Sequence, residues 1–307
     1  MKADASKASL PAMVTGVRIL PPPFKRKTML KFAADGWRGT ISREVTFENI
    51  EKLTAGLAVY LIGRDLIKLP LIVSYDSRFL SEHFAAAAVK KLAEAGAYCL
   101  LTERDVPLPI IAWEIRDRGA GGAIYIGTDS SFPTQSGLRF IPGAGGPLTE
   151  ADMLAVSQSG MGRINQLNKA KSRIERFEPR DRYFQYLAGS VNAGAIKEAR
   201  PKVVIDPMYG AARGYADQFL QRLGCRTEEI HNYRDVLFNG SVPDLLEENL
   251  SELKAQMAES GAPLGLAFNS VGDRCAGIDK RGKYFLGQAE QDAILAAVRF
   301  IESQAGK

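Results

Sequence analysis

The sequence predicts an α/β protein in which helices cover mostly parallel sheets. Apolar runs typical of buried strands alternate with segments whose apolar residues recur at helical spacing. Two such series follow one another, and a segment rich in Gly, Ser, Lys and Arg separates them at about residues 142–182. At 307 residues the chain is long enough for two domains, each with its own hydrophobic core.

The first series begins near Leu30. Residues 1–28 mix Ala, Ser and Lys with a run of three prolines, which predicts a flexible or extended arm. A first helix is predicted because apolar residues share one helical face, namely Ile50, Leu53, Leu57 and Leu61. Ser81 is expected to cap a second helix that Gly96 ends.

The other predicted elements continue the alternation of strand and helix. In the first series, strands are expected at residues 69–74, 97–102 and 122–127, with a helix near residues 109–118. In the second, strands are expected at 203–206, 227–230 and 264–268, with helices at 213–223, 247–260 and 288–303.

Composition excludes several classes of protein. No apolar run reaches the roughly 20 residues needed to cross a bilayer, so no membrane partner is expected and we expect a cytoplasmic protein. The three cysteines are far apart and lie in or beside apolar segments, which predicts buried reduced thiols rather than disulfides or a metal site.

A net charge of +5 suits an anionic ligand. A nucleic acid is not expected, since no nucleic-acid-binding motif accompanies the basic residues.

Four segments carry sequence motifs in a fixed order. Residues 32–39 read Phe-Ala-Ala-Asp-Gly-Trp-Arg-Gly, and 74–81 read Ser-Tyr-Asp-Ser-Arg-Phe-Leu-Ser. Residues 127–140 read Gly-Thr-Asp-Ser-Ser-Phe-Pro-Thr-Gln-Ser-Gly-Leu-Arg-Phe, and 206–215 read Asp-Pro-Met-Tyr-Gly-Ala-Ala-Arg-Gly-Tyr. In this order they resemble the α-D-phosphohexomutase family, which comprises phosphoglucomutases and phosphomannomutases.

The resemblance implies two tandem phosphohexomutase-type three-layer α/β domains with mixed, mostly parallel sheets. The predicted division places the arm at residues 1–28, the first domain at 29–150, a linker with a connecting helix at 151–195 and the second domain at 196–307. Family enzymes carry a third and a fourth domain that recognise sugar and phosphate, and we expect both to be absent from this chain.

The family's phosphoserine loop is altered at its reactive positions. Aligned on Gly-Leu-Arg-Phe at residues 137–140, the phosphoserine position falls on Asp129, the next position on Ser130 and the family's general-base lysine on Arg139. An acyl phosphate on Asp129 would be far more labile than a phosphoserine, and a guanidinium cannot act as a general base. A shift of one residue would instead make Ser130 the phosphoryl acceptor.

Two arginines match active-site positions of the family. Arg38 and Arg78 could pair with Asp129 through charge-assisted hydrogen bonds. Asp76 could equally hold Arg78 as a local partner.

The family's metal loop is altered as well. The run that matches Asp-Gly-Asp-x-Asp-Arg, which holds Mg²⁺ in active members, is Asn-Ser-Val-Gly-Asp-Arg at residues 269–274. Asn269 could offer a carbonyl and Asp273 a carboxylate, but Val271 offers nothing to a cation that demands oxygen ligands. We therefore expect no cofactor. Arg274 matches the arginine beside this loop and is expected to pair with Asp273.

Two functions follow from the resemblance. The first is a family member of hexose phosphate metabolism that has lost catalysis and binds a hexose phosphate or another small anion, as a homodimer or with a separate partner chain. The alternative is an active phosphohexomutase completed by a partner chain, with Ser130 as phosphoryl acceptor.

Overall fold

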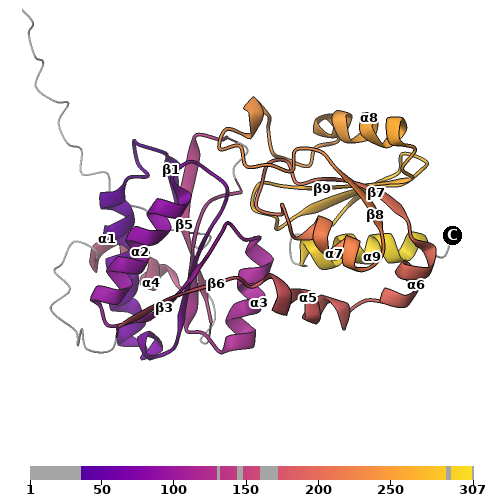
Figure 1. The fold of residues 1–307 in the computed structure, drawn as a ribbon. Coiled ribbons are helices and arrows are strands. Elements are labelled where there is room, and N and C mark those ends of the chain that lie inside the picture. The colour runs from indigo at the N-terminus through magenta and orange to yellow at the C-terminus, as the bar shows by residue number, and fades with distance from the viewer. Residues whose placement is uncertain (1–35, 130–131, 144–147, 160–171, 288–291, 306–307) are drawn as a thin grey trace, which may run out of the picture.

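The computed structural model describes residues 36–129, 132–143, 148–159, 172–287 and 292–305, which form two α/β units side by side (Figure 1). The predicted N-terminal arm at residues 1–28 lies outside these residues. Within them, no helix combines the length and the apolar character needed to span a membrane.

The first unit is built on a six-stranded mixed sheet. Its strands lie in the order β1 (Trp37–Thr40), β5 (Gln135–Pro142), β4 (Gly122–Ile126), β2 (Leu71–Tyr75), β3 (Tyr98–Thr102) and β6 (Arg173–Phe177). The first two pairings, β1 with β5 and β5 with β4, are antiparallel, and the other three are parallel. Parallel β4, β2 and β3 therefore bring their carboxyl ends to one edge.

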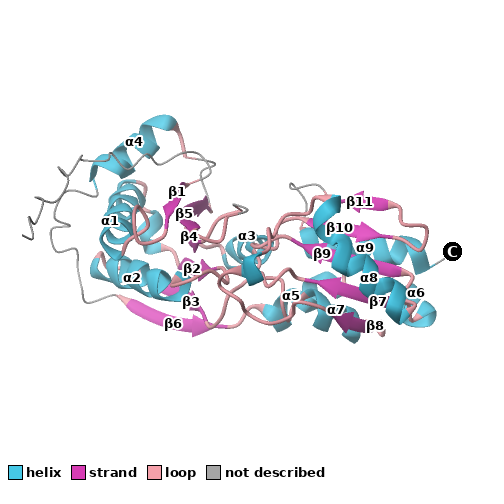
Figure 2. Ribbon diagram, turned by 90° about the horizontal axis from the view of Figure 1, so that it is seen from above, coloured by secondary structure: helices cyan, strands magenta, loops and turns pink. Residues whose placement is uncertain are grey.

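Helices cover both faces of this sheet (Figure 2). On one face lie α1 (Phe47–Gly63), α2 (Ser81–Glu94) and α4 (Glu150–Ser159), with the short 3-10 helix Leu66–Lys68 following α1. On the other lies α3 (Leu108–Arg118). The predicted apolar face of α1 is confirmed, because the side chains of residues 50, 53, 57 and 61 are all buried. Ser81 is the first residue of α2 rather than its cap, and its hydroxyl donates to Asp76 instead.

The range 151–195, predicted as a linker with a connecting helix, contains parts of the first unit. Helix α4 packs against α1, and β6 extends the sheet as the parallel neighbour of β3. Charged residues dominate β6, so its sequence lacks the apolar run from which a strand would be predicted. Its backbone pairing with β3 and the Arg118 guanidinium over the Phe177 ring, 4.6 Å from the centroid, hold it in place.

The second unit is built on a five-stranded sheet in the order β11 (Tyr284–Leu286), β10 (Cys275–Ile278), β9 (Leu264–Phe268), β7 (Lys202–Asp206) and β8 (Arg226–Glu229). The pairings of β7 with β8 and β9 are parallel, and those of β10 are antiparallel. Helix α8 (Ser251–Ser260) covers one face, while α7 (Ala216–Arg222) and α9 (Ala293–Ala305) cover the other. The helices α5 (Arg180–Ala188) and α6 (Ala193–Ala199) lead into this unit.

The helices predicted in the second unit differ from the observed ones at their first residues. The helix predicted from residue 213 begins at Ala216, because Gly214 has a φ of 75° that no helix accommodates. The helix predicted from residue 247 has a 3-10 first turn, η4 (Glu247–Leu250), and becomes α-helical as α8 from Ser251; a separate 3-10 segment, η3 (Phe238–Gly240), lies upstream. The helix predicted from residue 288 begins as α9 at Ala293, and residues 288–291 lie outside the described residues.

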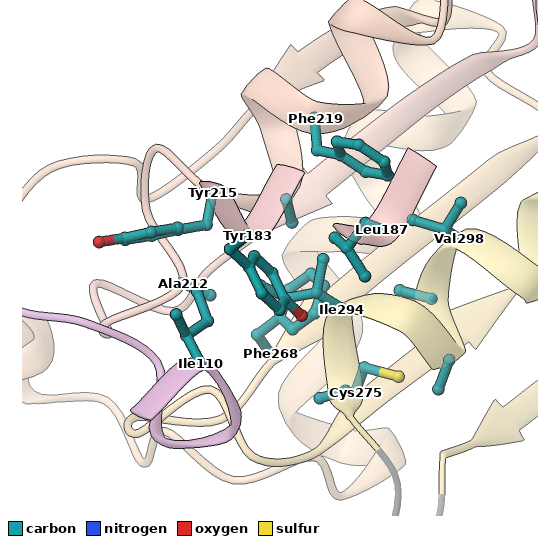
Figure 3. Close-up of a cluster of buried hydrophobic side chains, with 14 of the residues drawn as sticks. Ile110, Tyr183, Leu187, Ala212, Tyr215, Phe219, Phe268, Cys275, Ile294 and Val298 are labelled. Atoms are coloured by element: carbon teal, nitrogen blue, oxygen red, sulfur yellow. The ribbon is translucent and has the colours of Figure 1, made fainter. Parts of the chain in front are cut away.

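One hydrophobic core runs through both units. It extends from Tyr125 of the first sheet through α3 and α5 to the face of the second sheet that α7 and α9 cover. Tyr183 of α5 lies at its centre (Figure 3), fully buried, with its ring 5.6 Å from that of Trp113 and its hydroxyl donating to Asp292 at 2.5 Å. The cysteines, Cys99, Cys225 and Cys275, are buried and free, as predicted.

Polar contacts also join the units. Arg234 of the second unit donates from Nε to the Ser77 carbonyl at 3.0 Å and from Nη2 to the Arg78 carbonyl at 3.1 Å. Its two terminal nitrogens also donate to the Glu82 carboxylate at 3.0 and 2.6 Å. A second bridge joins Arg213 Nη2 to Asp105 Oδ2 at 2.5 Å.

Arg234→Ala should destabilise the chain by about 1–3 kcal/mol, because it removes a forked charge-assisted contact together with two hydrogen bonds to carbonyls. Urea unfolding measures the loss, and Arg226→Ala on the exposed edge of β8 is the control. Equal losses in the two variants would show that Arg234 does not join the units.

Candidate functional site

A buried ion pair lies where the two units meet. Asp76 follows β2, and its Oδ2 accepts from Arg78 Nε at 3.0 Å, with both side chains fully buried. Asp76 Oδ1 accepts from Ser81 Oγ at 2.7 Å and from the Arg78 amide at 3.1 Å. The sequence left open whether Asp76 or Asp129 holds Arg78. In the structure Arg78 pairs directly with Asp76, and the charge of Asp129 acts on it as well.

Arg78 ties together three segments that are far apart in sequence. Its Nη1 donates to the Phe132 carbonyl at 2.9 Å, and its Nη2 to the Thr128 carbonyl at 3.0 Å. The same Nη2 donates to Ser270 Oγ of the second unit at 3.1 Å. The guanidinium also lies over the Phe238 ring, 4.9 Å from its centroid.

Gly127 makes this arrangement possible. A Cβ at this position would lie 2.4 Å from Asp76 Oδ2, and the backbone has a φ of 151°. The lack of a side chain lets the loop after β4 approach the carboxylate, which also accepts from the Thr128 amide at 3.3 Å.

Burial shifts the pKa values of both members of the pair. It raises the pKa of the Asp76 carboxyl and lowers the pKa of the Arg78 guanidinium, because each charged form loses its water. Their mutual attraction opposes both shifts. Buried pairs of this kind hold geometry, and their net contribution to stability depends on how completely they are hydrogen-bonded.

Asp129, at the position that the resemblance assigns to the phosphoserine, has an ion-pair partner. Its Oδ1 lies 3.5 Å from Arg38 Nη1, and the two side chains are 37% and 45% exposed. Arg38 thus pairs with Asp129 as predicted from the motifs. Ser130, the alternative acceptor, lies outside the described residues.

Arg139, at the position of the family's general-base lysine, reaches across to the second unit. Its Nη1 lies 4.0 Å from Asp273 Oδ2, and both side chains are mostly buried. This contact joins β5 of the first unit to the loop after β9 of the second.

In the loop after β9, side-chain oxygens accept hydrogen bonds from other residues of the same loop. Asn269 is buried, and its Oδ1 accepts from the amides of Asp273 at 3.1 Å and Arg274 at 3.0 Å. Its Nδ2 donates to Asp273 Oδ1 at 2.8 Å. Val271, which replaces a family carboxylate, is buried and apolar.

The oxygen atoms of this loop do not fit the requirements of a Mg²⁺ site. The carbonyl of Asn269 closes its own loop, and the carboxylate of Asp273 already faces an amide and a guanidinium. A magnesium site requires several oxygen ligands in near-octahedral geometry. In the part of the chain that the structure describes, no group of three or more His, Cys, Asp or Glu side chains could hold a metal ion.

Arg274 does not pair with Asp273 as expected. Its Nη2 lies 3.5 Å from Asp244 Oδ1, while Asp273 turns towards Asn269 and Arg139. Thirty positions separate Arg274 from Asp244, so no local pattern predicts this pair. Sequence reasoning also missed Ser270, which only the fold brings to Arg78.

The sequence matches known protein families over most of its length. Residues 29–160 match the family described as phosphoglucomutase/phosphomannomutase, alpha/beta/alpha domain I. Residues 181–282 match alpha/beta/alpha domain II of the same family.

Individual proteins of this family are also similar to the chain in sequence. The chain is 27% identical over 274 residues to a phosphoglucosamine mutase of Clostridium kluyveri, covering 87% of this chain and 58% of the relative. It is 26% identical over 273 residues to a phosphoglucomutase/phosphomannomutase of Thermococcus kodakarensis, with 87% and 59% covered. The chain thus spans about three fifths of the length of the curated relatives it matches.

A solved structure shares the fold. The crystal structure of a phosphoglucomutase/phosphomannomutase family protein from Burkholderia thailandensis superimposes with a TM-score of 0.73 at 20% identity. The match covers 83% of this chain and 56% of that one.

Arg78→Met should destabilise the chain by about 3–5 kcal/mol, because it leaves the carboxylate of Asp76 buried without a counter-charge. Arg38→Met should cost at most about 1 kcal/mol, since the pair with Asp129 is exposed. Chemical unfolding measures both. Adding Asp76→Asn to Arg78→Met should recover part of the loss. Equal losses in the two single variants would contradict the central place given to Arg78.

Proposed function

The chain belongs to the phosphoglucomutase/phosphomannomutase family, and from this membership we propose that it is a non-catalytic member that binds hexose phosphates. Phosphoryl transfer in this family requires a phosphoserine, a general base and a bound Mg²⁺. In this proposal, the chain keeps the scaffold around these three positions, but ion pairs within the chain occupy them in place of the groups that transfer the phosphoryl group.

One observation carries the proposal. The charged groups at the family's reactive positions have ion-pair partners within the chain: Arg38 with Asp129, and Arg139 with Asp273. Asp129 offers a permanent negative charge where an active enzyme places a removable phosphoryl group. Arg139 cannot take a proton from a sugar hydroxyl, because a guanidinium has only donors and no lone pair to accept a proton.

The loop at residues 269–274 supports the same reading. With the carbonyl of Asn269 engaged by two amides, it lacks the oxygen ligands that a divalent cation needs. Stabilisation of charge on a transferring phosphoryl group is the main contribution of such a cation. Nothing in these residues replaces it.

A hexose phosphate is the ligand that fits the proposed role. Arg38 and Arg274 are 45% and 31% exposed, and each has a carboxylate partner about 3.5 Å away. A phosphate group could replace the carboxylate of Asp129 as the partner of Arg38. The net charge of +5 favours anionic ligands over the whole surface.

The purified chain should convert none of the hexose 1-phosphates of glucose, mannose or glucosamine to 6-phosphates, when each is supplied with its 1,6-bisphosphate and Mg²⁺. Titration calorimetry with Mg²⁺ alone should give no saturable heat. A phosphoglucosamine mutase in the same assay is the positive control. Turnover that Ser130→Ala abolishes would overturn the proposal and identify the phosphoryl acceptor.

Asp129→Asn should raise the affinity for glucose 1-phosphate, because it removes an anion that competes with the phosphate for Arg38. The gain should be at most about fivefold, since exposed pairs contribute at most about 1 kcal/mol. Calorimetry compares it with Asp65→Asn, which lies on an exposed turn, and with Asp129→Asn combined with Arg38→Ala. A gain that persists without Arg38 would contradict this account of the site.

A further inference from the structure

A cavity of about 220 Å³ opens in the second unit beside the carboxyl ends of β7 and β8. The chain leaves these neighbouring strands towards opposite faces of the sheet. Helix α7, which follows β7, packs into the core shared with the first unit, whereas α8 packs into a separate core on the other face (Figure 1). In open α/β sheets, ligands bind in crevices outside the carboxyl ends of the strands.

A buried carboxylate forms the inner wall of the cavity. Asp206 is the last residue of β7, and its side chain is 3% exposed. Its Oδ1 accepts from the Met208 amide at 2.7 Å and lies 3.0 Å from His231 Nδ1. The hydrogen bonds that described residues make to this carboxylate all reach Oδ1, so Oδ2 is left as an acceptor for a ligand.

The cavity is acidic in a chain that is basic overall. Glu248 and Glu252 line it together with Asp206, and no Lys or Arg is among the described residues that line it. The one imidazole, of His231, lies between Asp206 and Glu252, 2.9 Å from Glu252 Oε2. Carboxylates thus outnumber the only basic group, and the local potential favours a cation.

The remaining lining residues indicate an organic cation. Met208 and Tyr209 give the cavity an apolar and aromatic side, and the Tyr209 ring lies 4.6 Å from that of His231. Apolar lining of this kind suits the carbon skeleton of an organic ligand. Within the described residues, this set of acids and histidine does not form a metal site. The volume also exceeds that of a single ion.

We propose that this cavity binds a small amine that carries hydroxyl groups. Its ammonium group donates to Asp206 Oδ2 and to the glutamates, and its carbon skeleton lies against Tyr209. Its hydroxyls meet Ser241, Asn249 and Ser251, which also line the cavity. Neither Arg38 nor Arg274, where the hexose phosphate is proposed to bind, is among the residues that line it, so the two sites are distinct.

Two matched pairs of compounds test the charge requirement on the full chain: glucosamine against glucose, and ethanolamine against ethylene glycol. NMR titration at near-neutral pH, followed through resonances of α8 and of the loop around His231, measures each affinity. The amine of at least one pair should bind at least about tenfold more tightly than its neutral partner, since hydrogen bonds to charged groups are worth more than neutral ones.

Variants then locate the site. Asp206→Asn, which keeps an acceptor for the Met208 amide, should weaken amine binding about tenfold, and Glu252→Gln should weaken it less. Val242→Trp, at an exposed lining position, should block the cavity without removing charge. Glu259→Gln, on the same helix as Glu252 but outside the cavity, should have no effect.

Three results would overturn the proposal. They are the absence of binding by both amines at tens of millimolar, equal affinities within both pairs, and amine binding that Asp206→Asn and Val242→Trp both leave unchanged. Circular dichroism of each variant excludes loss of fold as the cause of weaker binding.

Discussion

The buried ion pair of Asp76 and Arg78 is the interaction on which the rest of the site depends. Taking both charges out of water is unfavourable, and the pair persists because its groups are extensively hydrogen-bonded. The partners of Arg78 come from the loop after β4 and, through Ser270, from the loop after β9. One guanidinium therefore fixes the two loops on which the family places its phosphoserine and its metal. The shared core around Tyr183 supports the same relative placement of the two units.

Around this fixed centre, the altered positions compensate one another. The carboxylate of Asp129 meets Arg38, and the guanidinium of Arg139 meets Asp273 across the junction. Such pairs need neither a phosphoryl group nor a divalent cation to balance their charge, which is why we interpret the substitutions as a coordinated loss of chemistry. The cavity at Asp206 differs, because its carboxylates outnumber its single imidazole. We therefore interpret the chain as carrying two sites. At the anion site the positive and negative side chains are equal in number, whereas at the cation site of Asp206 the negative side chains are in excess.

The sequence predicted the elements that have a strong local signal. The buried face of α1 was predictable because apolar residues recur at the helical period, and the pair of Arg38 with Asp129 followed from motif positions. Strand β6 was not, since its charged residues acquire a strand conformation only by pairing with β3. Contacts between distant positions, such as Arg274 with Asp244, depend on the fold alone. The cavity was missed for the same reason, although Asp206 ends a strand that was predicted.

If the substitutions removed the chemistry of the family, the loop after β4 accepts no phosphoryl group. Incubation of the chain with glucose 1,6-bisphosphate, followed by intact-protein mass spectrometry and peptide mapping, tests it most directly. We expect an unmodified mass and unmodified peptides across residues 127–140. A stable phosphoryl group on Ser130 would contradict it, because the loop would then retain the acceptor of an active mutase.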